Sequence, residues 1–269
     1  MIIDAHTHLG EANGSILTER DLLASMDRSG VDYSIVLAER VFGGEYSQIE
    51  HLLKVSKKNP RIKAVVDCDF AELDVEQINR IIELLETNVA VGVKFYLGYD
   101  EYYPTNEKLF PIYEYCQKHS KAVIFHTGML ETGSSGLLKY AHPLLIDEVA
   151  HLFPKLKIVI AHMGNPWLLD CAAVLAKNRF VYADVSAFFE EFRPISHDDV
   201  AIFVQRMKDI QLFLGSFNKF IFGTDWPLYD QAEYIKAVEA LELTPQEHDA
   251  VFWKNAASVF NLDIDPKKD

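Results

Sequence analysis

Cysteine is scarce in this chain. Its three cysteines, Cys68, Cys116 and Cys171, lie far apart and form no Cys-x-x-Cys pair. An odd number of widely spaced thiols indicates neither a disulfide framework nor a cysteine-based zinc knuckle. We therefore expect buried thiols in a reducing environment, which indicates a cytoplasmic protein.

Positive charge and long apolar runs are also lacking. The formal net charge is −14, which argues against nucleic acid or an anionic membrane as a partner, because both require a basic surface. No apolar run approaches the roughly 20 residues that a membrane-spanning helix needs. Met1 leads directly into a strand-like segment with no basic region or cleavage site, so we expect no signal peptide.

Glycine-rich phosphate-binding loops are missing as well. The chain contains no Gly-x-Gly-x-x-Gly motif, so the usual ligand of an open, doubly wound sheet is not expected. No flexible linker or change in composition divides the sequence. We therefore predict one domain over residues 1–269, which is a usual size for an α/β barrel.

Short β-rich runs alternate with amphipathic helical segments along the whole chain. Several of the runs are almost continuously apolar, as expected for parallel strands buried on both faces. The predicted strands are Ile2–Ala5, Tyr33–Leu37, Ile62–Asp67, Ala90–Phe95, Ala122–Phe125, Ile158–Ala161, Val181–Asp184 and Phe220–Phe222. Eight such repeats predict an α/β protein with a (β/α)8 TIM barrel, and an open doubly wound sheet is the alternative.

Capping signals mark several helix ends. Thr18 with Asp21 and Ser196 with Asp199 resemble capping boxes, and Gly30 suits a helix C-cap. The segment Thr244–Glu247 places proline at the first helical position. This segment lies beyond the eighth repeat, so we predict an extra C-terminal helical segment that closes the bottom or the side of the barrel.

Polar side chains stand where the apolar strands end. His6 and His8 are two residues apart, so in an extended chain they point to the same face. Other strands end in Lys94, His126, His162 and Asp225. In a barrel these ends meet at one mouth, and burying such groups without partners would cost several kcal/mol. A divalent cation would satisfy them together, so the pattern predicts a metal site.

Aromatic residues are expected around the same mouth. They are Tyr96, Tyr99, Tyr102, Tyr103, Trp167, Phe188, Phe189 and Trp226. Such side chains suit a planar substrate, and packing on the barrel rim is the alternative interpretation of each.

Four motifs, in order along the chain, carry a resemblance to a known family. They are Asp4-Ala-His-Thr-His8, Phe125-His-Thr-Gly128, Ala161-His-Met-Gly164 and Gly223-Thr-Asp-Trp-Pro227. The chain resembles the amidohydrolase superfamily, and within it the amidohydrolase-2 branch that contains aminocarboxymuconate-semialdehyde decarboxylase-like proteins. The ending Asn255–Leu262 is similar to the terminal helix of that branch.

The resemblance implies one divalent metal ion bound by His6, His8, His126 and Asp225. Zinc is favoured, and manganese, iron and cobalt are alternatives. His162 and Asp225 would be the catalytic residues. In binuclear relatives a lysine at the position of Lys94 is carboxylated and bridges two metals, whereas in the mononuclear branch, which we favour, it would bind a substrate carboxylate. Relatives of this kind are often homodimers.

The function implied is hydrolysis by a zinc-activated water that cleaves an amide, ester or lactone of a small aromatic or carboxylate-bearing substrate. The alternative is a metal-dependent, non-oxidative decarboxylase acting on a small unsaturated or aromatic acid. That reaction needs a cationic clamp, for which Arg40, just after the second predicted strand, and Lys94, at the end of the fourth, are well placed. A metal-binding member of the fold without catalysis is the third possibility.

Overall fold

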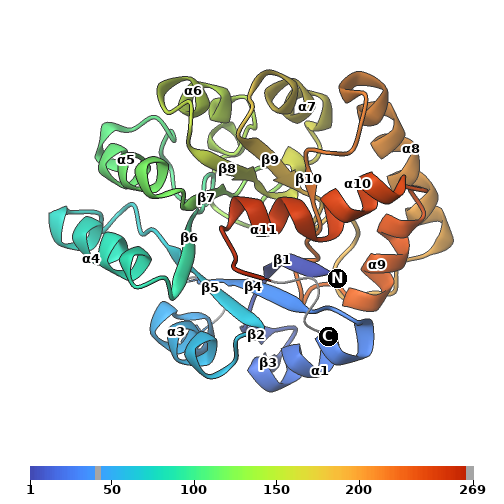
Figure 1. Ribbon diagram of the computed structural model, residues 1–269, viewed down its shortest axis with the longest axis horizontal. Coiled ribbons are helices and arrows are strands. Elements are labelled where there is room, and N and C mark those ends of the chain that lie inside the picture. Colours follow the sequence, from blue (N-terminus) through green and yellow to red (C-terminus); the bar gives the residue numbers. More distant parts are fainter. Residues whose placement is uncertain (40–43, 265–269) are drawn as a thin grey trace.

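The computed structural model describes residues 1–39 and 44–264. Its main sheet has eight parallel strands in chain order, with helices around the outside (Figure 1). The strands are β1 (Ile3–Thr7), β4 (Tyr33–Leu37), β5 (Ile62–Asp67), β6 (Ala90–Phe95), β7 (Ala122–Phe125), β8 (Lys157–Ile160), β9 (Val181–Asp184) and β10 (Phe220–Ile221). The predicted (β/α)8 TIM barrel is confirmed.

Backbone hydrogen bonds close the seam between the first and last strands. The N–H of Ala5 donates to the carbonyl of Phe222 at 2.9 Å, and the N–H of Asp225 donates to the carbonyl of His6 at 2.8 Å. Thr7 also forms a parallel bridge with Trp226. The seam therefore holds the chain after β10 directly beside the histidines of β1.

The helices cover the outer surface of the barrel. The longer ones are α1 (Glu19–Ser29), α3 (Ile49–Lys58), α4 (Val75–Glu86), α5 (Phe110–His119), α6 (Leu145–Leu152), α7 (Leu168–Lys177), α8 (His197–Leu214) and α9 (Gln231–Glu239). Short helical turns are α2 (Gly44–Ser47), η1 (Glu107–Leu109), η2 (Leu138–Tyr140) and η3 (Ala161–Gly164). Capping boxes start α1 at Thr18 and α8 at Ser196, and Gly30 ends α1 with a left-handed φ of 76°, as predicted.

The C-terminal segment forms α10 (Pro245–Asp249), the π-helical turn η4 (Ala250–Lys254) and α11 (Asn255–Val259). In Figure 1 it crosses in front of the barrel. Val259 and Phe260 pack on the side chains inside the barrel, including Ile3 and Ile124. The ammonium of Lys157, the first residue of β8, donates to the carbonyl of Ser258 at 2.5 Å. The segment therefore covers the amino-terminal ends of the strands, opposite the predicted site.

A small hairpin after β1 was not predicted. It consists of β2 (Gly10–Ala12) and β3 (Ser15–Leu17), paired antiparallel. Asn13 and Gly14 make its turn, with φ of 47° and 72°. Asn-Gly is the strongest short signal for a two-residue hairpin turn, so this element was readable from the sequence.

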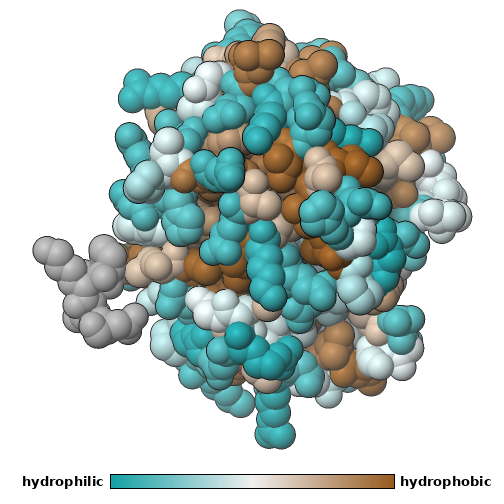
Figure 2. Space-filling view, turned by 90° about the vertical axis from the view of Figure 1, so that its right-hand side faces the viewer, coloured by the Kyte–Doolittle hydropathy of each residue, from teal (hydrophilic) through white to brown (hydrophobic). Residues whose placement is uncertain are grey.

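Two apolar layers stabilise the barrel, one between the sheet and the helices and one inside the strands. All three cysteines are buried, as expected. On the outside, α8 exposes Ile202, Leu212 and Phe213, and Figure 2 shows apolar groups among hydrophilic side chains on that side of the molecule. Over the described ranges, no helix combines the length and apolarity needed to cross a membrane.

Candidate metal centre

A cavity of about 910 Å³ opens at the carboxyl ends of the strands. The predicted site residues that line it are His6, His8, Lys94, His126, His162 and Asp225. They come from β1, β6, β7, β8 and β10 or the residues just after them, so strands far apart in sequence converge here. Arg40 lies outside the described residues, and its predicted role stays a prediction.

His6, His8 and Asp225 form the tightest set of donors in this cavity. Their ligand atoms all lie within 4.8 Å of one another. The carboxylate Oδ1 of Asp225 is 3.6 Å from Nε2 of His6 and 3.3 Å from Nε2 of His8. Asp225 adopts a left-handed backbone with φ of 67°, which turns the chain after β10 back toward β1. The three side chains can hold a metal ion.

Hydrogen bonds to backbone carbonyls set the protonation of two of the histidines. Nδ1 of His8 lies 3.2 Å from the carbonyl of Leu37, and Nε2 of His126 lies 3.1 Å from the carbonyl of Met129. Because a carbonyl oxygen only accepts, the nitrogen that faces it carries the proton. In the neutral rings, Nε2 of His8 and Nδ1 of His126 therefore keep their lone pairs, as in metal-binding histidines. This donor chemistry fits a borderline cation such as zinc.

Burial keeps most of these imidazoles neutral, which is the form that binds a metal. It lowers the pKa of His6, aided by the charge of Lys94, and it lowers the pKa of His126 far below its ordinary value. His8 is the exception, since burial acts to lower its pKa but the hydrogen bond and charge of Asp225 outweigh burial and raise it. Burial alone would raise the pKa of Asp225, but the neighbouring His6 and His8 hold it below its ordinary range.

Lys94 is a buried cation at the floor of the cavity. Its Nζ lies 3.3 Å from Nε2 of His6. Burial lowers its pKa to about 8, although the charges of Asp184, Asp225 and Glu39 oppose that shift. The ammonium is therefore easier to deprotonate than an exposed lysine.

Asp184 and Ser186 contact the site histidines but were not predicted as site residues. Asp184 ends β9, and Ser186 follows two residues later. Oδ2 of Asp184 is 2.9 Å from Nδ1 of His6, and Ser186 Oγ is 2.8 Å from Nδ1 of His162. Asp184 carries the same signal as Asp225, a polar residue at the end of an apolar strand, and could have been found by it.

Asp184 also belongs to a second group with metal-ligand spacing, together with His6 and His162. Its carboxylate, however, already accepts hydrogen bonds from the N–H of His162 at 3.0 Å and of Ser186 at 3.2 Å. The hydroxyl of Ser186 and Nδ1 of His6 add two further donors. These donors satisfy the acceptor sites of a carboxylate, so Asp184 supports the histidines and is poorly placed to bind a second ion.

The aromatic prediction is only partly correct. Tyr96, Tyr99, Phe188 and Phe189 line the cavity, and Tyr229, which was not predicted, joins them. The remaining aromatic residues pack elsewhere: Tyr102 stacks on Phe70, Tyr103 contacts Tyr140, Trp167 contacts His142 and Trp226 belongs to the buried core. The sequence could not distinguish residues that line the cavity from residues that pack on the barrel rim, because the conformation of the loops decides which residues do so.

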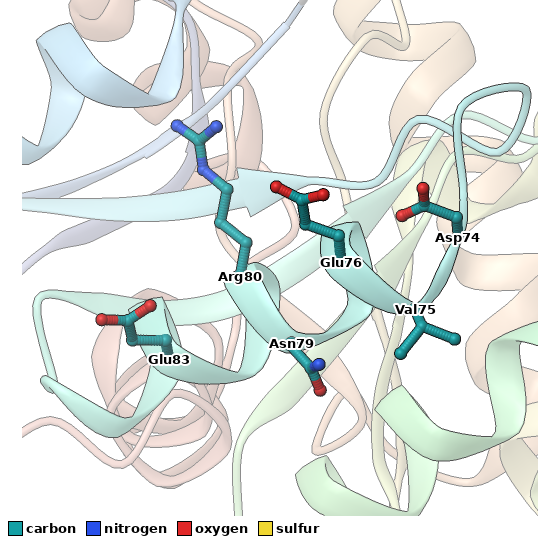
Figure 3. Close-up of a pocket in the computed structure, with 6 residues that line it drawn as sticks. All are labelled: Asp74, Val75, Glu76, Asn79, Arg80 and Glu83. Carbon is teal, nitrogen blue, oxygen red and sulfur yellow. The ribbon is translucent and has the colours of Figure 1, made fainter.

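A second hollow lies on the outer surface of α4. Its lining residues are Asp74, Val75, Glu76, Asn79, Arg80 and Glu83. All belong to one helix and its N-cap, and Figure 3 shows their side chains pointing outward in different directions. Arg80 pairs with Glu50 of the neighbouring helix α3. Nothing converges on this hollow as the histidines converge in the barrel mouth.

The fold and the site define a TIM-barrel protein with a candidate metal centre at the carboxyl ends of its strands. More particularly, the chain belongs to the amidohydrolase-2 family, because the model of that family, described as Amidohydrolase, matches residues 3–262. This is a family of enzymes, as the resemblance of the motifs predicted. No curated protein matches the chain.

Solved structures with the same fold have different named activities. A candidate 2-pyrone-4,6-dicarboxylic acid hydrolase from Acinetobacter baumannii, with bound citric acid, is 17% identical over 97% of this chain and 99% of its own, with a TM-score of 0.73. A zinc-bound amidohydrolase from Burkholderia multivorans is 16% identical with the same coverage and TM-score. The 5-carboxyvanillate decarboxylase from Sphingomonas paucimobilis is 13% identical, again with 97% and 99% coverage and a TM-score of 0.73. At these identities the likeness shows the fold.

Proposed function

We propose that this protein is a metal-dependent hydrolase that cleaves an amide, ester or lactone bond in a small molecule. The observation that carries the proposal is the convergence of His6, His8 and Asp225 within 4.8 Å of one another, in a cavity that His162 also lines. Membership of the amidohydrolase-2 family supports the same reaction class.

In this proposal His6, His8, His126 and Asp225 hold one divalent ion, with zinc favoured over manganese, iron or cobalt. When bound, such an ion supplies Lewis acidity, which polarises a substrate carbonyl and lowers the pKa of water. Asp225 accepts the proton of the attacking water, and His162 delivers a proton to the leaving group.

The cavity wall supports a small substrate with a planar or aromatic part. Tyr96, Phe188 and Phe189 provide flat apolar surface at the mouth. Lys94 is a buried cation that would bind a substrate carboxylate, and Arg40 stays a second predicted clamp. A homodimer, a cytoplasmic location and the absence of nucleic-acid or membrane partners also stay predictions.

Non-oxidative decarboxylation is the second candidate. The observation that favours it is Lys94, a buried cation beside the proposed metal ligands, which suits a substrate that presents a carboxylate to the metal. One structure of the same fold is a 5-carboxyvanillate decarboxylase. In this reaction His162 would protonate the carbon that loses carbon dioxide.

The test compares two substrate panels with the zinc-loaded and the chelated protein. Aromatic esters and lactones report hydrolysis, and hydroxybenzoates with carbon dioxide detection report decarboxylation. We expect metal-dependent hydrolysis that His162→Ala and Asp225→Ala each abolish, whereas His197→Ala, whose side chain is 98% exposed, leaves it unchanged. Near-normal activity in either site variant contradicts the mechanism, and carbon dioxide release identifies the decarboxylase. Bound metal without turnover on either panel favours a non-catalytic protein.

A further inference from the structure

A buried chain of hydrogen bonds links His6 and His162 through Asp184 and Ser186. Nδ1 of His6 lies 2.9 Å from Oδ2 of Asp184, and the Ser186 hydroxyl donates to Oδ1 of the same carboxylate. On the other side, Oγ of Ser186 lies 2.8 Å from Nδ1 of His162. All four side chains are buried, so no bulk water competes for these bonds.

Only one arrangement of protons satisfies this chain of hydrogen bonds. A serine hydroxyl has a single proton, and in Ser186 it goes to Asp184. Oγ of Ser186 can then only accept, so Nδ1 of His162 must carry the proton of that bond. An ionised carboxylate also only accepts, so Nδ1 of His6 is protonated as well. Both rings are thereby left with an unprotonated Nε2.

A second observation agrees for His6. The ammonium of Lys94 lies 3.3 Å from Nε2 of His6, and an ammonium can only donate. Nε2 of His6 is therefore an acceptor. This agrees with the conclusion that the proton of this ring is on Nδ1. The ring of His162 lines the cavity while its Nδ1 is taken by Ser186, so its Nε2 is the nitrogen left for a ligand.

We propose that Asp184 and Ser186 are positioning residues that fix the protons of His6 and His162 on Nδ1, so that both rings present a lone pair on Nε2 to the cavity. One carboxylate thus prepares a metal-ligand nitrogen and a proton-accepting nitrogen together. Asp184 also holds the backbone N–H of His162 at 3.0 Å, where His162 has a left-handed φ of 59°, so it fixes the position of the ring as well as its proton.

The consequence for catalysis rests on the proposed function. With Nε2 unprotonated, His162 can take up the water proton that Asp225 first accepts and then deliver it to the leaving group. If the protons were on Nε2 instead, His6 could not bind a metal through that nitrogen, and His162 would begin as a donor.

The test reads the tautomers directly in the full-length, metal-free protein. Histidine is labelled with ¹⁵N, and long-range ¹H–¹⁵N correlation spectra distinguish Nδ1–H from Nε2–H rings. Variants His6→Gln and His162→Gln assign the signals by their disappearance. We expect Nδ1–H tautomers for both residues in the unmodified protein. Finding His162 as the Nε2–H tautomer overturns the proposal. This test does not depend on whether a Ser186 variant folds.

Variants of Ser186 then test the link. In Ser186→Ala, Nδ1 of His162 loses its acceptor, so we expect its signals to shift toward the Nε2–H form, and Ser186→Thr, which keeps the hydroxyl, restores the original pattern. Ser34→Ala is the matched control, because Ser34 is buried and its Oγ has no hydrogen-bond partner among the described residues. An unchanged His162 tautomer in Ser186→Ala also overturns the proposal.

Kinetics separate this proposal from the proposed function. On any substrate that is turned over, Ser186→Ala should lower kcat about tenfold or more with little change in KM, as the loss of a residue that orients a site histidine typically does. Recovery in Ser186→Thr is expected. If no substrate is turned over, the proposed function fails. The NMR spectra still decide independently whether the proposed tautomers are correct. If Ser186→Ala changes the tautomer of His162 but leaves kcat unchanged, only the proposed consequence for catalysis is contradicted.

Discussion

The carboxylate of Asp4, on the first strand, accepts two hydrogen bonds from Thr224, which follows the last strand. The N–H of Thr224 lies 3.0 Å from Oδ1, and its hydroxyl lies 2.6 Å from Oδ2. The amide of Gln231 donates to Oδ2 at 2.8 Å. Burial raises the pKa of Asp4 to about 6, against the effect of these bonds. The contact fixes the segment that carries Asp225 beside the histidines of β1.

Replacing Asp4 by alanine should destabilise the protein. The change leaves the N–H and hydroxyl of Thr224 and the amide of Gln231 without their buried acceptor. Each unsatisfied group costs about 1–3 kcal/mol, so we expect the free energy of unfolding to fall by about 3 kcal/mol or more. Urea unfolding measures it. Thr224→Ser keeps the hydroxyl and serves as the control, and a loss no larger in Asp4→Ala than in Thr224→Ser would show that this contact does not hold the seam.

Metal analysis should find one ion per chain after loading with zinc. Because a ligand that binds only the folded state stabilises it, removal with a chelator should lower Tm by on the order of 5 °C, compared with metal at 100 times its Kd. His8→Ala and Asp225→Ala should each retain far less metal, because each removes a donor from the tightest group in the cavity. His197→Ala, on the surface, should bind normally. Full metal content in Asp225→Ala would remove that carboxylate from the ligand set.

Much of the barrel could be predicted because its strands are buried on both faces and read as apolar runs. Five of them, including β4 (Tyr33–Leu37) and β6 (Ala90–Phe95), have the predicted bounds. The hairpin Gly10–Leu17 was missed because its strands have three residues each and no apolar periodicity. Its only signal was the Asn13-Gly14 turn.

The site was predictable to the extent that it depends on which residues end a strand. His6 lies near the end of β1, His126 and Asp225 follow β7 and β10, and all three meet in the cavity. The tautomers were not predictable, because they depend on contacts between distant segments, such as that between Nδ1 of His6 and the carboxylate of Asp184. Ser186 was missed for the same reason, since a serine near a strand end means little until its partners are known.

Lys94→Met tests whether the lysine binds substrate or bridges two metals. Methionine fills a similar volume and removes the buried ammonium, so the barrel should fold. We expect KM for a carboxylate-bearing substrate to rise about tenfold or more, since a charge-assisted bond contributes about 1.5–3 kcal/mol, while the metal content stays at one per chain. Lys121→Met is the control, because Lys121 is also buried but bonds Asn88 at the other end of the strands. Two ions in the unmodified protein and one in Lys94→Met would instead support a carboxylated, bridging lysine.

Glu247, in the first turn of α10, should make stability depend on pH. Its Oε1 accepts the N–H of Phe217 at 3.0 Å, and its Oε2 accepts the hydroxyl of Thr244 at 2.7 Å. Burial alone would raise the pKa of this carboxyl, but the hydrogen bonds outweigh burial and lower it. A lowered pKa in the folded state means that the ionised form stabilises the fold above the unfolded-state pKa. This contribution is lost as the pH falls through the folded-state value.

Glu247→Gln removes the charge and keeps the shape. We expect the variant to be less stable by about 1 kcal/mol at pH 7, in the range of other helix-cap losses. The difference in unfolding free energy between the two proteins should shrink as the pH is lowered below about 4.5, because the protonated carboxyl then resembles the amide. Urea unfolding at a series of pH values measures it, with Glu76→Gln in the exposed first turn of α4 as the control. A difference that stays constant or grows on acidification would mean that Glu247 stabilises α10 through its shape and not through its charge.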